Sequence, residues 1–217
     1  MINWSSIDTV LLDMDGTLLD LSFDNYFWQA YVPMQYAKQN GLSKAEGFAK
    51  LAAWTNAQIG TLNWYSLPYW SQELGMDIEA LKLGLAHHIT LRPGTEKFLQ
   101  ALRDANKEVV LVTNADPLVM DIKMEATGIE PYFHELYSSH TFNAAKEHSE
   151  FWPVLQQQHG FNAERTLFID DNFHVLRAAQ EFGIAHLASI RQPDTGLPAR
   201  PDTAPYIGIH HFNEVLP

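Results

Sequence analysis

The sequence predicts an α/β protein built on a parallel sheet, and three short apolar runs are the first observation behind this prediction. Residues 10–12, 109–112 and 166–169 are largely apolar without alternation, and each run ends in polar residues. Such runs are typical of strands that are covered on both faces, as in a parallel sheet. Residues 136–139 and 186–190 are weaker strand candidates.

The second observation is that helical patterns separate these runs. In residues 95–105 the apolar side chains recur at helical spacing and share one face. Asp116 followed by Pro117 is typical of a helix start, and Gly128 and Gly183 are typical of helix ends. Strands that alternate with helices indicate an α/β domain with a parallel sheet. In such sheets, ligands bind beyond the carboxyl ends of the strands.

Residues 21–90 have a different pattern from the rest of the chain. They lack a strand-like apolar run, are rich in aromatic residues and contain a capping-box pattern at Ser43 and Glu46. We therefore expect two units. One is an α/β core of residues 1–20 and 91–217, and the other is a helical cap of residues 21–90 inserted into it.

The composition excludes several classes of function. The chain has 217 residues and a net charge of −12. This charge disfavours nucleic acid and anionic membranes as partners unless a local basic stripe exists, and the Lys and Arg residues are scattered singly. Without any cysteine, a disulfide scaffold, a cysteine zinc site and a thiol nucleophile are excluded. Because no apolar stretch has the length of a membrane span and no signal-peptide pattern is present, we expect a cytoplasmic protein.

The polar residues that follow the three strongest strand candidates are expected to meet at one edge of the sheet. They are Asp13, Asp15, Thr113, Asn114, Asp170 and Asp171. Crowded carboxylates repel one another unless a cation lies among them or some of them are protonated. Oxygen ligands without His or Cys favour Mg²⁺, which commonly shares its remaining ligands with water and substrate phosphate. The pattern therefore predicts a magnesium site for phosphoryl transfer, in which one carboxylate can be the nucleophile and another the general acid and base.

These residues also resemble the sequence motifs of the haloacid dehalogenase-like hydrolase superfamily. Residues 13–17 (DMDGT) resemble its first motif, residues 112–114 (VTN) the second, Lys146 the third and residues 168–172 (FIDDN) the fourth. The resemblance covers essentially the whole chain. It implies a Rossmann-like, three-layer α/β/α core, and one branch of the family carries a helical cap at the position of residues 21–90.

The resemblance also implies roles for individual residues. Asp13 would be the nucleophile and Asp15 the general acid and base. Asp13, the main-chain carbonyl of Asp15 and Asp171 would hold Mg²⁺, and Asp170 is a further candidate ligand. The implied phosphate-binding residues are Thr113, the Asn114 amide and Lys146.

Two departures from the family pattern concern these roles. Many relatives carry a second Asp four residues after the first Asp of the fourth motif, and that later position is Val175 here. The spacing to Gly183 favours Asp171 as the metal ligand. Residue 145 is Ala where close relatives have Pro, so we expect a less rigid loop before Lys146.

Residues 15–28 and 61–65 resemble, within this family, the bacterial purine 5′-nucleotidases that act on GMP and IMP. This implies a nucleoside 5′-monophosphate as substrate, and purines are favoured. An aromatic ring can stack on a nucleobase, and polar groups can recognise its edge. The candidate substrate contacts in these stretches are Asn25, Tyr26, Asn63 and Trp64.

Two alternative functions remain open at this point. One is a phosphatase or phosphomutase for a small sugar or cofactor phosphate. The other is a non-catalytic protein that keeps the fold and binds a ligand or partner. A dehalogenase is disfavoured, because Asp15 supplies the acid and base that a phosphoester requires.

Overall fold

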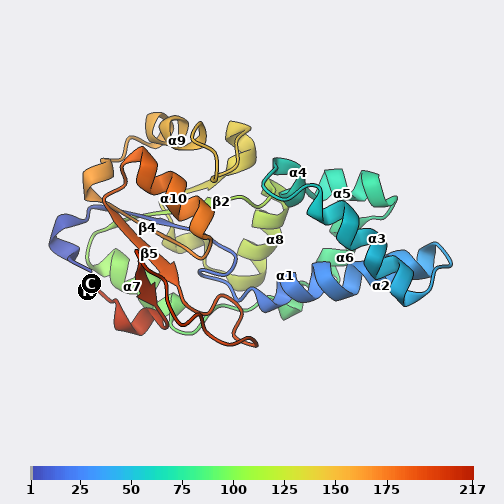
Figure 1. The fold of residues 1–217 in the computed structure, drawn as a ribbon. Helices are drawn as coiled ribbons and strands as arrows, with labels where there is room; N and C mark the ends of the chain where they lie inside the picture. Colours follow the sequence, from blue (N-terminus) through green and yellow to red (C-terminus); the bar gives the residue numbers. More distant parts are fainter. Residues whose placement is uncertain (1) are drawn as a thin grey trace.

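The computed structural model describes residues 2–217, and one parallel sheet of six strands organises them (Figure 1). The strands follow the order β3-β2-β1-β4-β5-β6, and each neighbouring pair is parallel. Their bounds are Thr9–Leu12 (β1), Glu108–Thr113 (β2), Glu135–Ser138 (β3), Thr166–Asp170 (β4), His186–Ile190 (β5) and Ile207–Ile209 (β6). The predicted α/β fold is confirmed. Strand β6 was not predicted, because a run of three residues carries almost no periodic signal.

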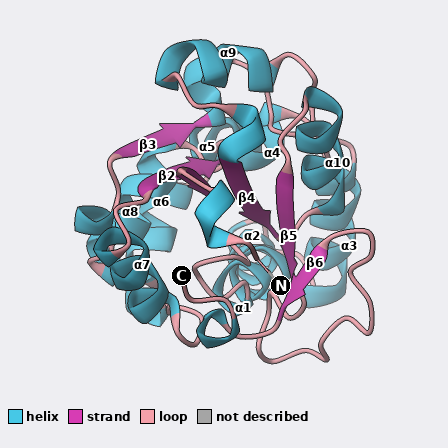
Figure 2. Cartoon of the chain, turned by 90° about the vertical axis from the view of Figure 1, so that its left-hand side faces the viewer, coloured by secondary structure: helices cyan, strands magenta, loops and turns pink. Residues whose placement is uncertain are grey.

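Helices cover both faces of the sheet, so the core has three layers (Figure 2). Their bounds are Thr95–Asp104 (α7), Pro117–Thr127 (α8), Phe151–His159 (α9) and Phe173–Phe182 (α10). Short 3-10 turns lie at Trp4–Ser6, Ala86–His88, Glu130–Tyr132, Ser139–Phe142, Ala163–Arg165 and Phe212–Glu214. Val10 and Leu12 of β1 share a core with α7 and α8, whereas Leu11 shares a core with α9 and α10. Successive side chains of a strand point to opposite faces, so β1 is buried on both.

The helical insertion, which we define as residues 21–90, follows β1 and contains no strand. Its helices are Ser22–Tyr26 (α1), the π-helical turn Phe27–Tyr31, Val32–Gln39 (α2), Lys44–Asn56 (α3), Leu62–Tyr65 (α4), Leu67–Leu74 (α5) and Ile78–Leu83 (α6). At its base the N–H of Asp20 donates to the carbonyl of Thr90 at 2.9 Å, and a bridge pairs Leu19 with Leu91. The two connections therefore lie side by side, and the helices project from one end of the sheet (Figure 1).

Local sequence explains how the helices of the insertion begin and turn. Helix α3 starts with the predicted capping box, in which Ser43 and Glu46 each accept a hydrogen bond from the other's main-chain N–H. Helix α1 runs into the π-helical turn, which changes the angular phase of the side chains that follow. None of the helices within residues 2–217 has both the length and the apolar character needed to cross a bilayer.

Candidate active site

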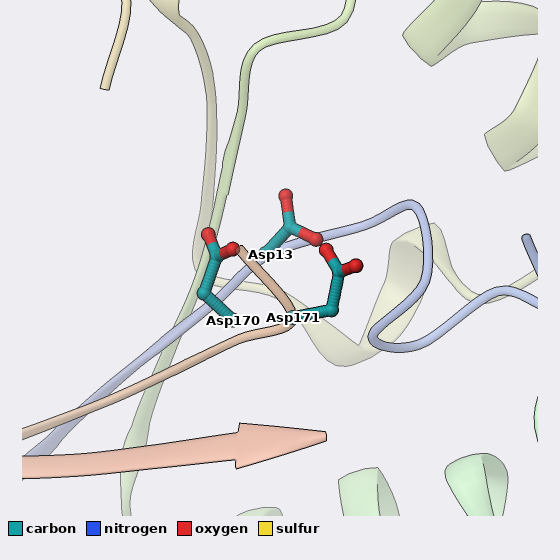
Figure 3. A group of neighbouring side chains, drawn as sticks. All are labelled: Asp13, Asp170 and Asp171. Carbon is teal, nitrogen blue, oxygen red and sulfur yellow. The ribbon is translucent and has the colours of Figure 1, made fainter. Parts of the chain in front are cut away.

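Predicted site residues lie together at the carboxyl ends of neighbouring strands. Asp13 directly follows β1, Asp170 is the last residue of β4 and Thr113 is the last residue of β2. Because β1 lies between β2 and β4 in a parallel sheet, the three ends meet at one edge. Asp171 comes next, and Figure 3 shows its carboxylate beside those of Asp13 and Asp170. One oxygen from each of these three carboxylates lies within 4.8 Å of the others.

The turn that follows Asp13 requires a glycine at position 16. Gly16 has a φ of +81°, in the left-handed region, and its N–H donates to the carbonyl of Leu19 at 2.9 Å. A Cβ at this position would lie 2.9 Å from Cγ of Asp171, which is too close for a real contact. The glycine of the DMDGT motif therefore allows the loop that holds Asp15 to pack against the carboxyl group of Asp171.

Lys146 is the main cation among these acids, and we call Asp13, Lys146, Asp170 and Asp171 the sheet-edge cluster. The buried ammonium group donates to Oδ1 of Asp13 at 2.6 Å, to Oδ2 of Asp170 at 2.8 Å and to the carbonyl of Val112 at 3.0 Å. Burial lowers the pKa of Lys146, but the two carboxylates outweigh this effect and raise it overall. Lys146 is therefore charged in this site at every physiological pH.

When all its groups are ionised, the sheet-edge cluster carries an excess of negative charge, because three carboxylates surround one lysine. Arg200 is the next nearest cation, and its Nη2 lies 3.6 Å from Oδ2 of Asp171. Burial, together with the charge of Asp13, raises the pKa of Asp171 to about 7. Either a proton or a bound cation stabilises a carboxyl group whose pKa is raised in this way.

The oxygens of the cluster are not equally available to a metal ion. Asp170 accepts from Lys146 with Oδ2 and from the N–H of Asn172 with Oδ1 at 2.8 Å. By contrast, Oδ2 of Asp13 is buried and has no hydrogen-bond partner among the described residues. Asp13 and Asp171 therefore fit a hard divalent cation such as Mg²⁺, whereas Asp170 is engaged in anchoring Lys146.

The loop that carries Lys146 is held on both sides, although it has Ala and not Pro at position 145. Oδ1 of Asn114 accepts from the N–H of Lys146 at 2.9 Å, and Nδ2 of Asn114 donates to Glu147 at 2.8 Å. The indole N–H of Trp152 donates to the carbonyl of Lys146 at 3.0 Å. The side chain of Asn114 is therefore occupied by this loop, and the expectation of a less rigid loop finds no support in these contacts.

A second group of charges connects the core to the helical insertion, and we call Asp15, Lys123, Asp24 and Lys82 the lysine bridge. Nζ of Lys123, on α8, lies 2.5 Å from Oδ1 of Asp15 and 2.6 Å from Oδ2 of Asp24. Nζ of Lys82, on α6, lies 2.8 Å from Oδ1 of Asp24. Both lysines are almost completely buried, and the Lys82 ammonium also lies 4.7 Å from the ring centre of Phe27.

Our reading of the sequence missed the lysine bridge, although α8 contains a signal for it. Val119 and Ile122 are buried on α8, and Lys123 follows on the same face. A lysine on the apolar face of a helix needs a buried partner of opposite charge, because an unpaired buried charge is very unfavourable. The partners Asp15 and Asp24 could not be identified, since they lie about a hundred residues away in the chain.

A cavity of about 610 Å³ lies between the sheet edge and the helical insertion. The predicted site residues that line it are Asp13, Asp15, Asn25, Trp64, Thr113, Asn114, Lys146, Asp170 and Asp171. Other lining side chains, which we did not predict, include Trp28, Gln29, Thr55, Tyr65, Phe173, His174 and Arg200. The cavity therefore combines the charged edge with aromatic and amide groups of the insertion.

Tyr26 and Asn63, two of the four candidate substrate contacts, do not line this cavity. Tyr26 is 47% exposed and packs near Tyr31, and the exposed Asn63 donates to Gln58 at 3.3 Å. Neighbouring residues on a helix point about 100° apart, so the position of one residue on the cavity wall does not place its neighbour there. Asn25, the partner of Tyr26 in sequence, does line it, and its Nδ2 donates to Asp194 at 2.7 Å, so part of this amide is already used.

The fold and this cavity place a group of carboxylates at the carboxyl ends of the strands of a parallel sheet. The family model of haloacid dehalogenase-like hydrolases matches residues 7–183, from the start of the sheet to the end of α10. The chain belongs to this family and is therefore a hydrolase. The resemblance seen in the four sequence motifs is confirmed.

Individual relatives agree with this assignment. The chain is 44% identical over 196 residues to the GMP/IMP nucleotidase YrfG of Escherichia coli (strain K12). These residues are 90% of this chain and 88% of the relative. It is 25% identical over 179 residues to the pyrimidine 5′-nucleotidase YjjG of the same strain, covering 76% of this chain and 77% of that protein. Among solved structures, a HAD phosphatase from Thermococcus onnurineus matches with a TM-score of 0.80 at 21% identity, over 96% of this chain and 95% of that one. The similarity to the solved structure, at this level of identity, supports the fold alone.

Proposed function

We propose that this hydrolase is a Mg²⁺-dependent phosphomonoesterase that forms an aspartyl-phosphate on Asp13 and acts on nucleoside 5′-monophosphates, with GMP and IMP favoured. The observation that supports it most is the sheet-edge cluster. There, three carboxylates surround one lysine, and Oδ2 of Asp13 has no hydrogen-bond partner within residues 2–217. The 44% identity to a GMP/IMP nucleotidase supports the choice of substrate.

The residues of the site have separate tasks in this proposal. Asp13 attacks phosphorus as the bond to the 5′-oxygen breaks, and Asp15 gives its proton to that leaving oxygen. Water then attacks the phosphoryl group on Asp13 and gives a proton to Asp15, which releases phosphate and restores both acids. Burial raises the pKa of Asp15 to about 6, against the opposing charge of Lys123, so its acid form is accessible near neutral pH.

The remaining groups neutralise and orient the phosphoryl oxygens. Lys146 is charged and held beside Asp13. The Thr113 hydroxyl oxygen accepts from the N–H of Ala115 at 3.0 Å, and its hydrogen can be donated to a phosphoryl oxygen. Asp13, Asp171 and the main-chain carbonyl of Asp15 would hold Mg²⁺, which supplies further positive charge to the phosphoryl group when bound.

The helical insertion, acting as a cap, would supply substrate selectivity. The sheet edge can recognise a phosphoryl group, so discrimination between nucleosides has to come from the other wall of the cavity. Trp64 and Trp28 line that wall and offer flat faces on which a base can stack, a contact worth about 1–3 kcal/mol. Gln29 and Thr55 lie on the same wall and can hydrogen-bond to a base edge.

Phosphate release from a panel of monophosphates tests the proposal. The panel contains GMP, IMP, AMP, a pyrimidine nucleotide, a hexose phosphate and p-nitrophenyl phosphate, each with Mg²⁺ and after complete chelation. We expect kcat/KM to be highest for GMP and IMP and activity to vanish without the metal. A clear preference for the hexose phosphate would support the sugar-phosphate alternative. No hydrolysis of any substrate would support a non-catalytic protein.

A pair of tryptophan variants tests the role of the insertion. Trp64→Ala should lower kcat/KM for GMP by about tenfold or more, as expected for a lost base stack, and p-nitrophenyl phosphate should be affected much less. Trp54→Ala is the matched control, because Trp54 packs against Tyr36 inside the insertion and does not line the cavity. If both variants lowered the two activities equally, Trp64 would be a packing residue and not a substrate contact.

A further inference from the structure

We propose that Lys123 is a positioning residue, which holds the Asp15 carboxylate for proton transfer and links its placement to the helical insertion through Asp24. The inference rests on the proposed function, in which Asp15 protonates the leaving oxygen. The central observation is one ammonium group shared by two carboxylates. Nζ of Lys123 lies 2.5 Å from Asp15 and 2.6 Å from Asp24.

Lys123 controls the orientation of Asp15 because the carboxylate has few other contacts. Among residues 2–217, Lys123 is the one group that hydrogen-bonds to it, and this bond uses Oδ1. The side chain of Asp15 is 24% exposed and lines the cavity, so without this bond it could turn to other rotamers. A general acid has to lie within hydrogen-bond reach of the atom that it protonates, and a displacement of about 1 Å can cost about a hundredfold in rate.

The position of Lys123 is itself fixed from the insertion. Asp24, on α1, uses Oδ2 for Lys123 and Oδ1 for Lys82, so both of its oxygens are occupied. Lys82 lies on α6, at the far end of the insertion in sequence, and is surrounded by aromatic rings of α1 and the π-helical turn. The order of contacts is therefore insertion, Lys123, then Asp15, which joins the placement of the proton donor to the element that covers the substrate.

A purely structural role for Lys123 makes a different prediction. If the lysine bridge only joined the insertion to the core, loss of either lysine would lower the stability or the amount of active enzyme. Every substrate would then lose activity by the same factor. If Lys123 positions the proton donor, the loss depends on how much the leaving group needs a proton. The alkoxide that leaves from GMP needs protonation, whereas p-nitrophenolate is a good leaving group and hardly needs it.

The experiment compares Lys123→Met with Lys82→Met, because both remove a buried ammonium that contacts Asp24 and only Lys123 contacts Asp15. The measured quantity is the ratio of kcat/KM for GMP to kcat/KM for p-nitrophenyl phosphate. This ratio reports the steps up to phosphorylation of Asp13, where the leaving group departs, and it does not depend on the fraction of folded enzyme. We expect this ratio to fall by about tenfold or more in Lys123→Met and to stay near the wild-type value in Lys82→Met. Lys123→Gln, which keeps a hydrogen-bond donor, should fall between Lys123→Met and the wild type, and it serves as the test if Lys123→Met does not fold.

The possible outcomes separate this inference from the proposed function. If the wild-type enzyme with Mg²⁺ hydrolyses neither substrate, the proposed function fails and the inference fails with it. If the wild type hydrolyses both and the ratio in the Lys123 variants stays within about twofold of wild type, the phosphatase proposal stands and the positioning role is refuted. An equal fall of the ratio in Lys82→Met would also refute it, because the effect would then belong to the whole bridge.

Discussion

Two groups of buried charges lie close together in this molecule and differ in their balance. The sheet-edge cluster contains three carboxylates and one lysine, and one oxygen of Asp13 has no hydrogen-bond partner among the described residues. The lysine bridge contains two carboxylates and two lysines, and both oxygens of Asp24 are paired. The cluster therefore has a place for another cation, whereas the bridge is already neutral.

In the proposed mechanism, this difference separates the tasks of two acids that are only two residues apart. Asp13 belongs to the unbalanced cluster, where a cation and a phosphoryl group can bind. Asp15 belongs to the bridge, where burial raises its pKa to about 6 although Lys123 opposes the shift. Pairs of acids in distinct environments are typical of enzymes that need one ionised group and one proton donor.

The largest expected effect comes from removing one acid from each group. Asp24→Asn leaves the buried ammonium groups of Lys82 and Lys123 without the carboxylate they share, and it should lower the free energy of unfolding by about 3–5 kcal/mol. Asp171→Asn removes a charge from a cluster that has too many, so it should leave the stability of the metal-free protein unchanged or higher. Urea unfolding with a chelator at neutral pH measures both.

The comparison between the two groups depends on the sign of each change in the free energy of unfolding. A loss in Asp171→Asn as large as that in Asp24→Asn would mean that the cluster is balanced without a metal ion. An Asp24→Asn variant as stable as wild type would mean that the lysine bridge is not held together by its charges.

A smaller effect concerns magnesium and pH. Because the folded-state pKa of Asp171 is raised to about 7 by burial and by Asp13, the stability that its proton provides is complete below about pH 4 and lost as the pH rises through 7. Mg²⁺ competes with that proton, so it should raise Tm clearly at about pH 8 and much less at about pH 5.5. Thermal unfolding with and without Mg²⁺ measures this, and Asp171→Asn should lose most of the shift. A shift of the same size at both pH values would contradict a site made by titrating carboxylates.

The smallest effect is expected at acid pH. Burial raises the pKa of Asp24, but Lys123 and Lys82 outweigh it and hold the pKa below its usual value. Its contribution to stability is therefore present above about pH 4 and lost as the pH falls further. The difference in unfolding free energy between wild type and Asp24→Asn should shrink between about pH 7 and about pH 3. A constant difference over this range would contradict the charge pairing.

The sequence predicts the sheet-edge cluster better than the bridge, for a physical reason. Parallel strands that start and end in register bring Asp13, Thr113 and Asp170 together, so knowing the strands is enough to know the neighbours. The contacts of Lys123 depend on how the insertion lies against α8, which no local pattern specifies. The sequence could only mark Lys123 as a charge on an apolar helix face.

The cavity wall formed by the helical insertion shows a second limit of prediction from the sequence. The resemblance picked out Asn25, Tyr26, Asn63 and Trp64 as candidate substrate contacts. Asn25 and Trp64 line the cavity, whereas Tyr26 and Asn63 are not among its lining residues. Which residue of a short helix faces inward depends on its phase, and short helices with a π-helical turn nearby give no stable period from which to read it. Trp28, beyond Asn25, lies in that turn and lines the cavity.

The division of labour between Asp13 and Asp15 is tested most directly by pre-steady-state kinetics of Asp15→Asn with p-nitrophenyl phosphate and Mg²⁺. This leaving group needs no proton, so Asp13 can still be phosphorylated, whereas the water that should hydrolyse the intermediate has lost its base. We predict a burst of p-nitrophenolate close to one equivalent of enzyme, followed by slow turnover, with the phosphoryl group found by mass spectrometry on the peptide that contains Asp13. The double variant with Asp13→Asn should show neither burst nor label. Steady turnover without a burst or label in Asp15→Asn, or near-normal turnover in Asp13→Asn, would contradict the account.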